Sequence, residues 1–315
     1  LLKLLRDLVR SQSRNYLLGG DNMPAKIIDG RKMSAEIREE LKVRVRRLKE
    51  RGITPGLGGI LVGEDPGSAT YVGLKSKACE EVGIKEEVVK SPENITEEEL
   101  LKNTERLNQD PKIHGIFIQL PLPQHLSEEK ALVAILSEKD VDGFHPVSVG
   151  KAWLGQPIFF PAVVIAIHEM LIRYGYDPKD KDVVIVNIDN MVGKPMASLL
   201  VQDKEKARAN VTLCYPSTPN LASYTRRADI LIVSVNKPKF ITADMVKEGV
   251  VVMDFGSNWV EDPVTQKRKT VGDVDFEAVK EKAEAISPVP GGVGPMLVTM
   301  LLVNTVAAAE RQASS

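Results

Sequence analysis

Apolar and polar residues alternate along the chain with two different periods. Short apolar runs of four to six residues are typical of buried strands, and one of them is Gly59 to Val62. A second set of apolar residues has helical spacing and consists of Ile37, Leu41, Val45 and Leu48. Ser34 is placed to cap that helix. Because such strands and helices follow one another repeatedly, the pattern predicts an α/β protein with parallel sheets covered by helices on both faces.

The same pattern places further elements in both halves. In the first half, Thr96 and Glu99 form a capping-box pattern that opens a helix through Leu107. The other elements expected there are a helix over 68–82 and strands over 87–89 and 115–120. In the second half we expect strands over 183–186, 211–214, 230–233 and 250–253, and helices over 192–202 and 296–310.

The second half has the local layout of a dinucleotide-binding unit. The strand over 183–186 is followed by a turn containing Gly193 and then by a helix. The glycine signature of that unit, Gly-x-Gly-x-x-Gly, is missing from the segment 187–195. Spacing alone therefore leaves two readings open, a Rossmann-like domain and a generic α/β domain.

Composition narrows the class of protein. A length of 315 residues fits two domains of ordinary size or one large one. The net charge of −1 lacks the excess of basic residues that nucleic-acid-binding proteins usually carry. The two cysteines cannot form a disulfide framework, and the four histidines lack metal-ligand spacing, so we expect no metal site. The longest apolar run, 296–309, is too short to span a membrane.

Residues 1–22 form a leader or targeting-like segment, set apart from the fold. The first 20 residues carry Lys3 and three arginines with Asp7 as the only acid, as mitochondrial presequences do. The alternative is a leader without a targeting role, since Met23 could initiate the chain.

Six segments occur in an order that identifies a family. They are Tyr71–Lys77, Gln119–Pro123, Lys139–Pro146, Val192–Ala197, Gly272–Phe276 and Pro288–Met296. Together they resemble the bifunctional methylenetetrahydrofolate dehydrogenase/methenyltetrahydrofolate cyclohydrolase family over roughly residues 24–311. The resemblance implies an enzyme of one-carbon metabolism and purine biosynthesis that oxidises 5,10-methylenetetrahydrofolate with NAD or NADP and hydrolyses the methenyl product to 10-formyltetrahydrofolate.

The resemblance also implies an architecture. We expect a catalytic and folate-binding α/β domain over 23–148, completed by the C-terminal helix 296–311, and a Rossmann-like NAD(P)-binding domain over 149–286 facing it across a cleft. Residues 287–295 would form a folate-contacting loop. The expected partners are tetrahydrofolate derivatives and a second copy of the chain in a homodimer, without nucleic acid or membrane. The expected location is the cytoplasm, or the mitochondrial matrix if residues 1–22 are a presequence.

Lys75 is the residue that we expect to carry the chemistry. It lies four residues after Tyr71, so on a helix the two share one face. By itself such a lysine is usually a solvated helix residue, and only a burial-lowered pKa would make it an acid or base near neutral pH. The resemblance implies that Lys75 is the catalytic lysine, Gln119 its assisting glutamine and Tyr71 a stacking residue. It also implies further folate contacts, which are Ile118, Leu120, Asp142, Pro290, Gly291, Gly292, Val293 and Gly294.

The cofactor half departs from the family pattern. The family's Gly-Arg-Ser after the first Rossmann strand is replaced by Asn187, Ile188 and Asp189. Differences also occur at 161–166, 215–216, 236, 256–258 and 297. The remaining expected cofactor contacts are Gly193, Pro216, Ser234 and Ser257.

The replaced arginine and serine would have met the 2′-phosphate of NADP, whereas an aspartate repels it, so we expect NAD to be favoured. If Asp189 instead turns away as a helix-start residue, this argument loses its force. Three hypotheses follow: a bifunctional enzyme leaning toward NAD, a cyclohydrolase without the dehydrogenase step, and a catalytically silent folate- or nucleotide-binding protein.

Overall fold

The computed structural model describes residues 25–261 and 268–313. The expectation for residues 1–22 lies outside these ranges. Within them the chain forms two compact units. Among the described residues, the first contains 35–162 and 298–313, and the second contains 25–34 and 163–297. The domain boundaries expected from the sequence stay a prediction.

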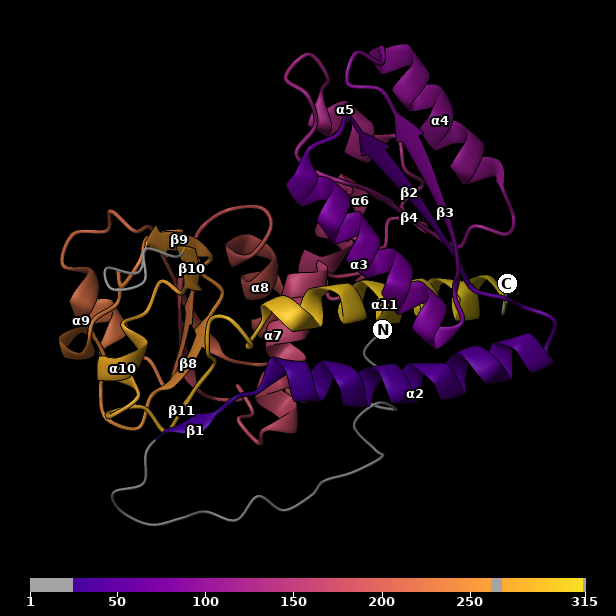
Figure 1. Cartoon of the computed structure of the whole chain (residues 1–315). Helices are drawn as coiled ribbons and strands as arrows, with labels where there is room; N and C mark the ends of the chain where they lie inside the picture. Colours follow the sequence, from indigo (N-terminus) through magenta and orange to yellow (C-terminus); the bar gives the residue numbers. More distant parts are fainter. Residues whose placement is uncertain (1–24, 262–267, 314–315) are drawn as a thin grey trace. The chain divides into compact units, whose positions relative to one another are not determined.

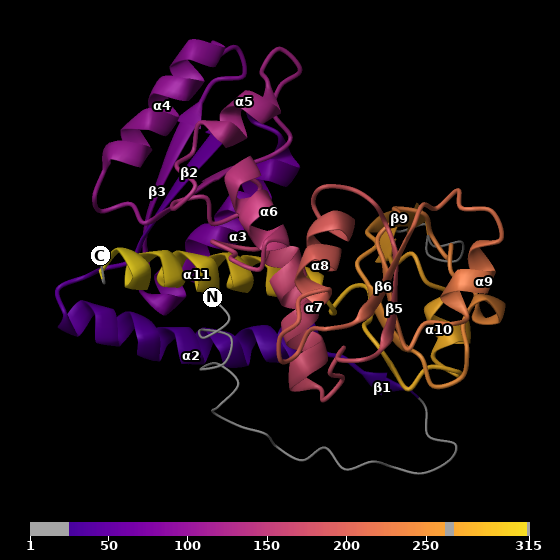
Figure 2. The same cartoon turned by 180° about the vertical axis from the view of Figure 1, so that it is seen from behind.

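The first unit is built on a three-stranded parallel sheet in the order β3-β2-β4 (Figures 1 and 2). The strands are β2 (Gly56–Val62), β3 (Lys85–Ser91) and β4 (Gly115–Ile118). The helices are α2 (Gly30–Glu50), α3 (Pro66–Val82), α4 (Glu97–Gln109), α5 (Glu128–Val133), α6 (Pro146–Trp153) and α11 (Gly294–Gln312). Of these, α2 and α11 begin with residues of the second unit.

Helices α3 and α4 cover opposite faces of this sheet. A side chain at Gly58 would meet Leu107 of α4, whereas one at the next residue, Gly59, would meet the ring of Phe117. Lys75 of α3 lies over that same ring. Because successive strand residues point to opposite faces, these contacts assign α4 to one face and α3 to the other.

Two predicted helix starts can be compared with the structure. The capping box of Thr96 and Glu99 at the start of α4 is confirmed, with both reciprocal hydrogen bonds present. The expected cap at Ser34 is wrong, because α2 begins at Gly30. The Asp29 carboxylate accepts from the Lys32 N–H and supplies the cap one turn earlier, and Ser34 is buried inside the helix.

The second unit contains a six-stranded parallel sheet in the order β1-β11-β8-β7-β5-β6. Its strands are β1 (Lys26–Ile27), β5 (Asp182–Val186), β6 (Asn210–Cys214), β7 (Ile230–Val233), β8 (Val251–Asp254) and β11 (Ala285–Ile286). Its helices are α7 (Ala162–Arg173), α8 (Gly193–Leu200), α9 (Leu221–Thr225), η1 (Ala243–Met245) and α10 (Phe276–Val279). A separate antiparallel pair joins β9 (Asn258–Glu261) and β10 (Arg268–Val271).

The strand order creates a switch point. The chain moves from β5 to β6 on one side and then returns to β7 on the other side of β5. In open α/β sheets, ligands bind outside the carboxyl ends of the strands at such a point. The edge of the sheet after β5 and β7 is therefore the place to look for a ligand site in this unit.

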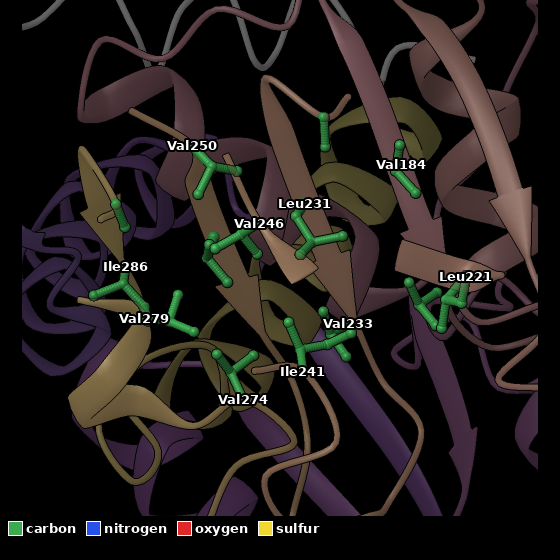
Figure 3. Close-up of a cluster of buried hydrophobic side chains, with 14 of the residues drawn as sticks. Val184, Leu221, Leu231, Val233, Ile241, Val246, Val250, Val274, Val279 and Ile286 are labelled. Atoms are coloured by element: carbon green, nitrogen blue, oxygen red, sulfur yellow. The ribbon is translucent and has the colours of Figure 1, made fainter. Parts of the chain in front are cut away.

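Apolar side chains hold this sheet together on one face. Figure 3 shows Val184, Leu231 and Val233 from the central strands, together with Val274 and Val279 from the segment around α10. All five side chains are at most 3% exposed. This core, made of residues of the second unit, contains no residue of the first.

The sequence reading missed the shortest strands. Strands β1 and β11 have two residues each, too few to show a period, and β10 reads Arg-Lys-Thr-Val with two exposed charged residues. Such segments become strands through pairing with a neighbour, which local pattern does not reveal. Within the part of the chain that the structure describes, no helix combines the length and apolar character needed to cross a membrane.

Replacing Thr96 by alanine tests the capping box. The variant leaves the Glu99 N–H without its acceptor, so we expect a loss of about 1 kcal/mol in the free energy of unfolding, measured by urea denaturation. Thr70→Ala is the matched control, because the Thr70 hydroxyl only donates back to the Pro66 carbonyl within α3. Equal stability of the two variants would contradict the assignment.

Candidate active site

The amine of Lys75 lies at the carboxyl end of β4. Its Nζ donates to Oε1 of Gln119 at 3.1 Å and lies 3.8 Å from the ring centroid of Phe117. Gln119 directly follows β4, and Phe117 belongs to it. The structure thus brings together two residues expected from the sequence, Lys75 and Gln119, and adds the aromatic ring beneath the amine.

The neighbouring backbone fixes this arrangement. The Gln119 side-chain amide donates to the Leu120 carbonyl at 2.7 Å, which turns Oε1 toward the lysine. The ring of Phe117 fits against β2 because a Cβ at Gly59 would lie 2.5 Å from it. The glycine of β2 is therefore needed to place the ring that Lys75 covers.

Burial and nearby charges act against each other on the amine. Burial lowers the pKa of Lys75, and the carboxylates of Asp142 and Glu86, together with Cys79, oppose this effect. A lysine whose pKa is lowered can exchange a proton nearer to neutral pH than a solvated one. The site has therefore the electrostatics required of an acid or base, which a surface helix lysine lacks.

Asp142 faces the same amine from a loop held by its neighbours. The Asp140 carboxylate accepts from the N–H groups of Gly143 and His145, and Asn304 of α11 donates to the Val141 carbonyl at 2.8 Å. Burial raises the pKa of Asp142 to about 6, helped by Asp140 and opposed by Lys75. The carboxylate is thus fixed by its backbone while its own oxygens stay available to a ligand.

The other expected residues of this unit have different surroundings. Tyr71 is 51% exposed on α3, one turn before Lys75. Ile118 is buried, and both Ile118 and Leu120 pack in the core cluster around β2 and β4. The sequence reading missed Phe117 and Glu86. Phe117 looked like one more apolar strand residue, and Glu86 lies in a charged strand whose pairing partner cannot be read from spacing.

The expected folate loop belongs to the second unit and is described by itself. Gly291 has φ 119°, a conformation that favours glycine, and its carbonyl accepts from the Gly30 N–H at 2.9 Å. The Gly292 N–H donates to the Pro288 carbonyl at 2.7 Å. Pro290 and Gly294 are exposed, whereas Val293 is buried. Gly291 and Gly292 are buried as well, so the loop is a fixed turn that is exposed only at its two ends.

The expected cofactor residues all follow strands of the second sheet. They lie after β5, β6, β7 and β8, at the shared carboxyl edge, and are Asn187, Ile188, Asp189, Gly193, Pro216, Ser234 and Ser257. Of these, Asn187, Gly193 and Ser234 are buried, and Asp189 and Ser257 are exposed. This edge is the one that the strand order marks as a ligand site.

Asn187 links the two sides of the switch point. Its side-chain amide donates to the Ser234 carbonyl after β7 at 2.7 Å, and its Oδ1 accepts from the Gly193 N–H at 3.0 Å. A Cβ at Gly193 would lie 2.1 Å from the Asn187 carbonyl oxygen, so only glycine fits there. The close approach of strand and helix that a dinucleotide-binding turn needs is therefore present without the usual glycine motif.

Asp189 occupies N–H groups at the start of α8. Its Oδ1 accepts from the N–H groups of Met191 and Val192 at 2.9 and 2.7 Å, and its Oδ2 from the Asn187 amide. A helix N-terminus normally offers such groups to phosphate. The edge of the sheet fits a dinucleotide, whereas the resident carboxylate disfavours a further anion at this turn.

Replacing Glu86 by glutamine tests the electrostatics of the site. Because the Glu86 carboxylate raises the pKa of Lys75, its removal should lower that pKa further, measured by NMR titration of the labelled lysine side chain. Glu87→Gln is the matched control, because Glu87 is adjacent to Glu86 in the same strand but pairs with Arg106 at 2.7 Å. A Lys75 pKa that rises or stays constant, or falls equally in both variants, would contradict this reading.

Comparisons with known proteins agree with the geometry. The catalytic domain of the tetrahydrofolate dehydrogenase/cyclohydrolase family matches residues 28–142, and its NAD(P)-binding domain matches 161–313. The bifunctional protein FolD of Moorella thermoacetica is 52% identical over 92% of this chain and 100% of its own length.

Two solved structures are also similar. The bifunctional FolD enzyme of Campylobacter jejuni is 46% identical, with a TM-score of 0.85 over 91% of this chain and 99% of that one. The Trypanosoma brucei dehydrogenase-cyclohydrolase, complexed with NADP and an inhibitor, is 36% identical, with a TM-score of 0.86 over 93% of this chain and 100% of that one. The chain belongs to the tetrahydrofolate dehydrogenase/cyclohydrolase family.

Proposed function

We propose that this protein is a bifunctional enzyme that oxidises 5,10-methylenetetrahydrofolate to the methenyl form and hydrolyses the methenyl form to 10-formyltetrahydrofolate. The observation that carries the proposal is the partly buried Lys75 amine, held by Gln119 above the ring of Phe117 in a chain of this family. Its tetrahydrofolate substrates follow from the family, as does the use of a nicotinamide dinucleotide.

Lys75 is the proposed catalytic residue of the hydrolytic step. Water adds to the carbon of the methenyl cation, and the neutral amine accepts a proton from that water as the carbon–oxygen bond forms. The carbon–nitrogen bond then breaks to give the 10-formyl product, with one proton released overall. Gln119 holds the amine in place, Asp142 accepts from the donors of the pterin edge, and Tyr71 stacks on the substrate.

The oxidative step depends on the second unit. A bound dinucleotide would supply the hydride acceptor for this step, so the task of the protein is to orient the methylene carbon and the cofactor. Asn187 and Gly193 keep the loops after β5 and β7 close together at the switch point. The loop from Pro290 to Gly294 is a fixed turn whose exposed ends, Pro290 and Gly294, would contact a flat substrate.

Replacing Lys75 by methionine tests the catalytic role. Methionine keeps most of the apolar stem and removes the amine, so we expect cyclohydrolase activity to fall at least about 100-fold while the protein stays folded. Lys77→Met is the control, because Lys77 is exposed on the same helix, and its activity should stay within about twofold of the parent. Full cyclohydrolase turnover in Lys75→Met would refute the assignment.

NAD is the proposed cofactor. Ile188 offers no group to a 2′-phosphate, and the Asp189 carboxylate is held in its turn by three hydrogen bonds. Two unit charges about 4 Å apart repel by roughly 4 kcal/mol at an effective dielectric near 20, and solvent reduces this value. Even a third of it corresponds to about tenfold in affinity. Asp189 is a helix-start acceptor, as the alternative expected, but its carboxylate stays at the turn after β5, where the N–H groups of Met191 and Val192 hold its charge in place.

Saturation kinetics with the two cofactors test this choice. We expect kcat/KM to be about tenfold higher with NAD than with NADP, and the double variant Ile188→Arg, Asp189→Ser to reverse the order. Asp203→Ser, which removes an exposed carboxylate elsewhere in the same unit, should leave the ratio unchanged. A parent enzyme that prefers NADP would refute the charge argument.

The occupied N–H groups of Met191 and Val192 also favour a second candidate. If the parent binds neither cofactor, the chain is a cyclohydrolase that has lost the dehydrogenase step. A silent folate- or nucleotide-binding protein would instead show neither activity. The homodimer and the cytoplasmic location also remain proposals, which sedimentation and fractionation can examine.

A further inference from the structure

Two buried aspartates lie at the carboxyl edge of the second sheet and are not among the expected site residues. Asp254 is the last residue of β8, and Asp273 follows β10 in the segment Gly272–Phe276. They are 3% and 0% exposed. Burying a carboxylate costs free energy unless hydrogen bonds satisfy its oxygens. The donors to these two carboxylates therefore show which backbone segments each aspartate fixes.

Asp273 gathers donors from two loops. Its Oδ2 accepts from the N–H groups of Val235 and Asn236 at 2.5 and 3.0 Å, and its Oδ1 from that of Lys237 at 2.8 Å. The Asn258 side chain donates to the same Oδ1 at 2.8 Å. Three successive N–H groups directly after Ser234 thus converge on one carboxylate, and Asn236 adopts φ 54° in this turn.

Asp254 holds the next loop and the segment that carries Asp273. Its Oδ1 accepts from the N–H groups of Gly256 at 2.8 Å and Asp273 at 3.1 Å, and its Oδ2 from that of Val274 at 3.0 Å. The Asp254 N–H donates to the Ser287 hydroxyl at 2.8 Å, at the base of the expected folate loop.

Two glycines make room for the carboxylates. A Cβ at Gly256 would lie 2.3 Å from the carboxyl carbon of Asp273, and a Cβ at Gly272 would lie 1.9 Å from Oδ2 of Asp254. Neither position accepts a side chain while the two carboxylates stay where they are. The backbone of both loops is therefore shaped around the aspartates, and not merely near them.

We propose that Asp273 and Asp254 are positioning residues for the dinucleotide. Their carboxylates fix the loops after β7 and β8, which carry Ser234 and Ser257, in the shape that a bound dinucleotide meets. This inference rests on the proposed dehydrogenase function. Neither residue has to touch the cofactor, because each acts through the backbone groups that it holds. The hydrolytic step, which depends on Lys75 in the first unit, does not need them.

The test compares dinucleotide affinity with cyclohydrolase activity in the full chain. Asp273→Asn keeps the shape of the side chain but replaces one acceptor oxygen by a donor that faces N–H groups. We expect the Kd for NADH, measured by fluorescence titration, to rise about tenfold or more, with cyclohydrolase kcat/KM within about twofold of the parent. The milder Asn258→Ala removes one donor to Asp273 and should raise the same Kd about threefold.

Asp229→Asn is the matched control. Asp229 precedes β7 at the opposite edge of the same sheet, where it accepts from the Asp182 N–H at 2.9 Å and pairs with Lys247 at 2.6 Å. Its variant should lose stability without a change in the Kd for NADH. This control separates a positioning role from a loss of stability alone.

The outcomes distinguish this inference from the proposed function. A parent that binds NADH and variants at Asp273 and Asn258 that bind it equally well would overturn the inference and leave the proposed function standing. An equal rise in Kd for Asp229→Asn would also overturn it. A parent with cyclohydrolase activity that binds neither NADH nor NADPH would overturn both. If Asp273→Asn does not fold, Asn258→Ala decides, and an unchanged Kd in that variant overturns the inference.

Discussion

The lysine amine at the end of β4 must be kept from water without being left unpaired, and the first unit is organised around this requirement. Gln119 supplies one acceptor, the face of Phe117 supplies the surface beneath, and Asp142 with Glu86 supplies opposing charge. Each of these groups favours the charged amine, whereas burial favours the neutral one. Burial has the larger effect and lowers the pKa of Lys75, so the amine releases a proton more readily than an exposed lysine does.

The second unit also places its expected site residues at the carboxyl edge of a parallel sheet, but its buried polar groups have a different role. Its buried polar groups are carboxylates and an amide, and their partners are mostly backbone N–H groups of the loops that follow the strands. Such groups fix the backbone more than they tune a proton. The first unit is therefore suited to proton chemistry, and the second to holding an extended ligand in a defined shape.

Much of this organisation can be read from the sequence. The capping box at Thr96 and the apolar strands are local signals, and they were sufficient for the α/β class. The positions of Lys75 and Gln119 follow from family motifs, but the ring of Phe117 does not, because its role depends on the missing side chain at Gly59, in a different strand. For Asp189 the sequence left two orientations open, and the structure shows the helix-start one, in which the carboxylate accepts from the N–H groups of Met191 and Val192.

The residues that make up each core bear on how the departures from the family can be tolerated. The core around β2 and β4 is made of residues of the first unit alone, and the core in Figure 3 of residues of the second. The hydrogen bonds of Asn187 and Asp189 also stay within the second unit. A substitution at this turn therefore changes hydrogen bonds whose partners lie in the second unit, whereas Lys75 and its partner Gln119 lie in the first. For this reason the choice and strength of cofactor binding can change by substitution while the electrostatics of the lysine site are retained, and the two activities of such a chain need not change together.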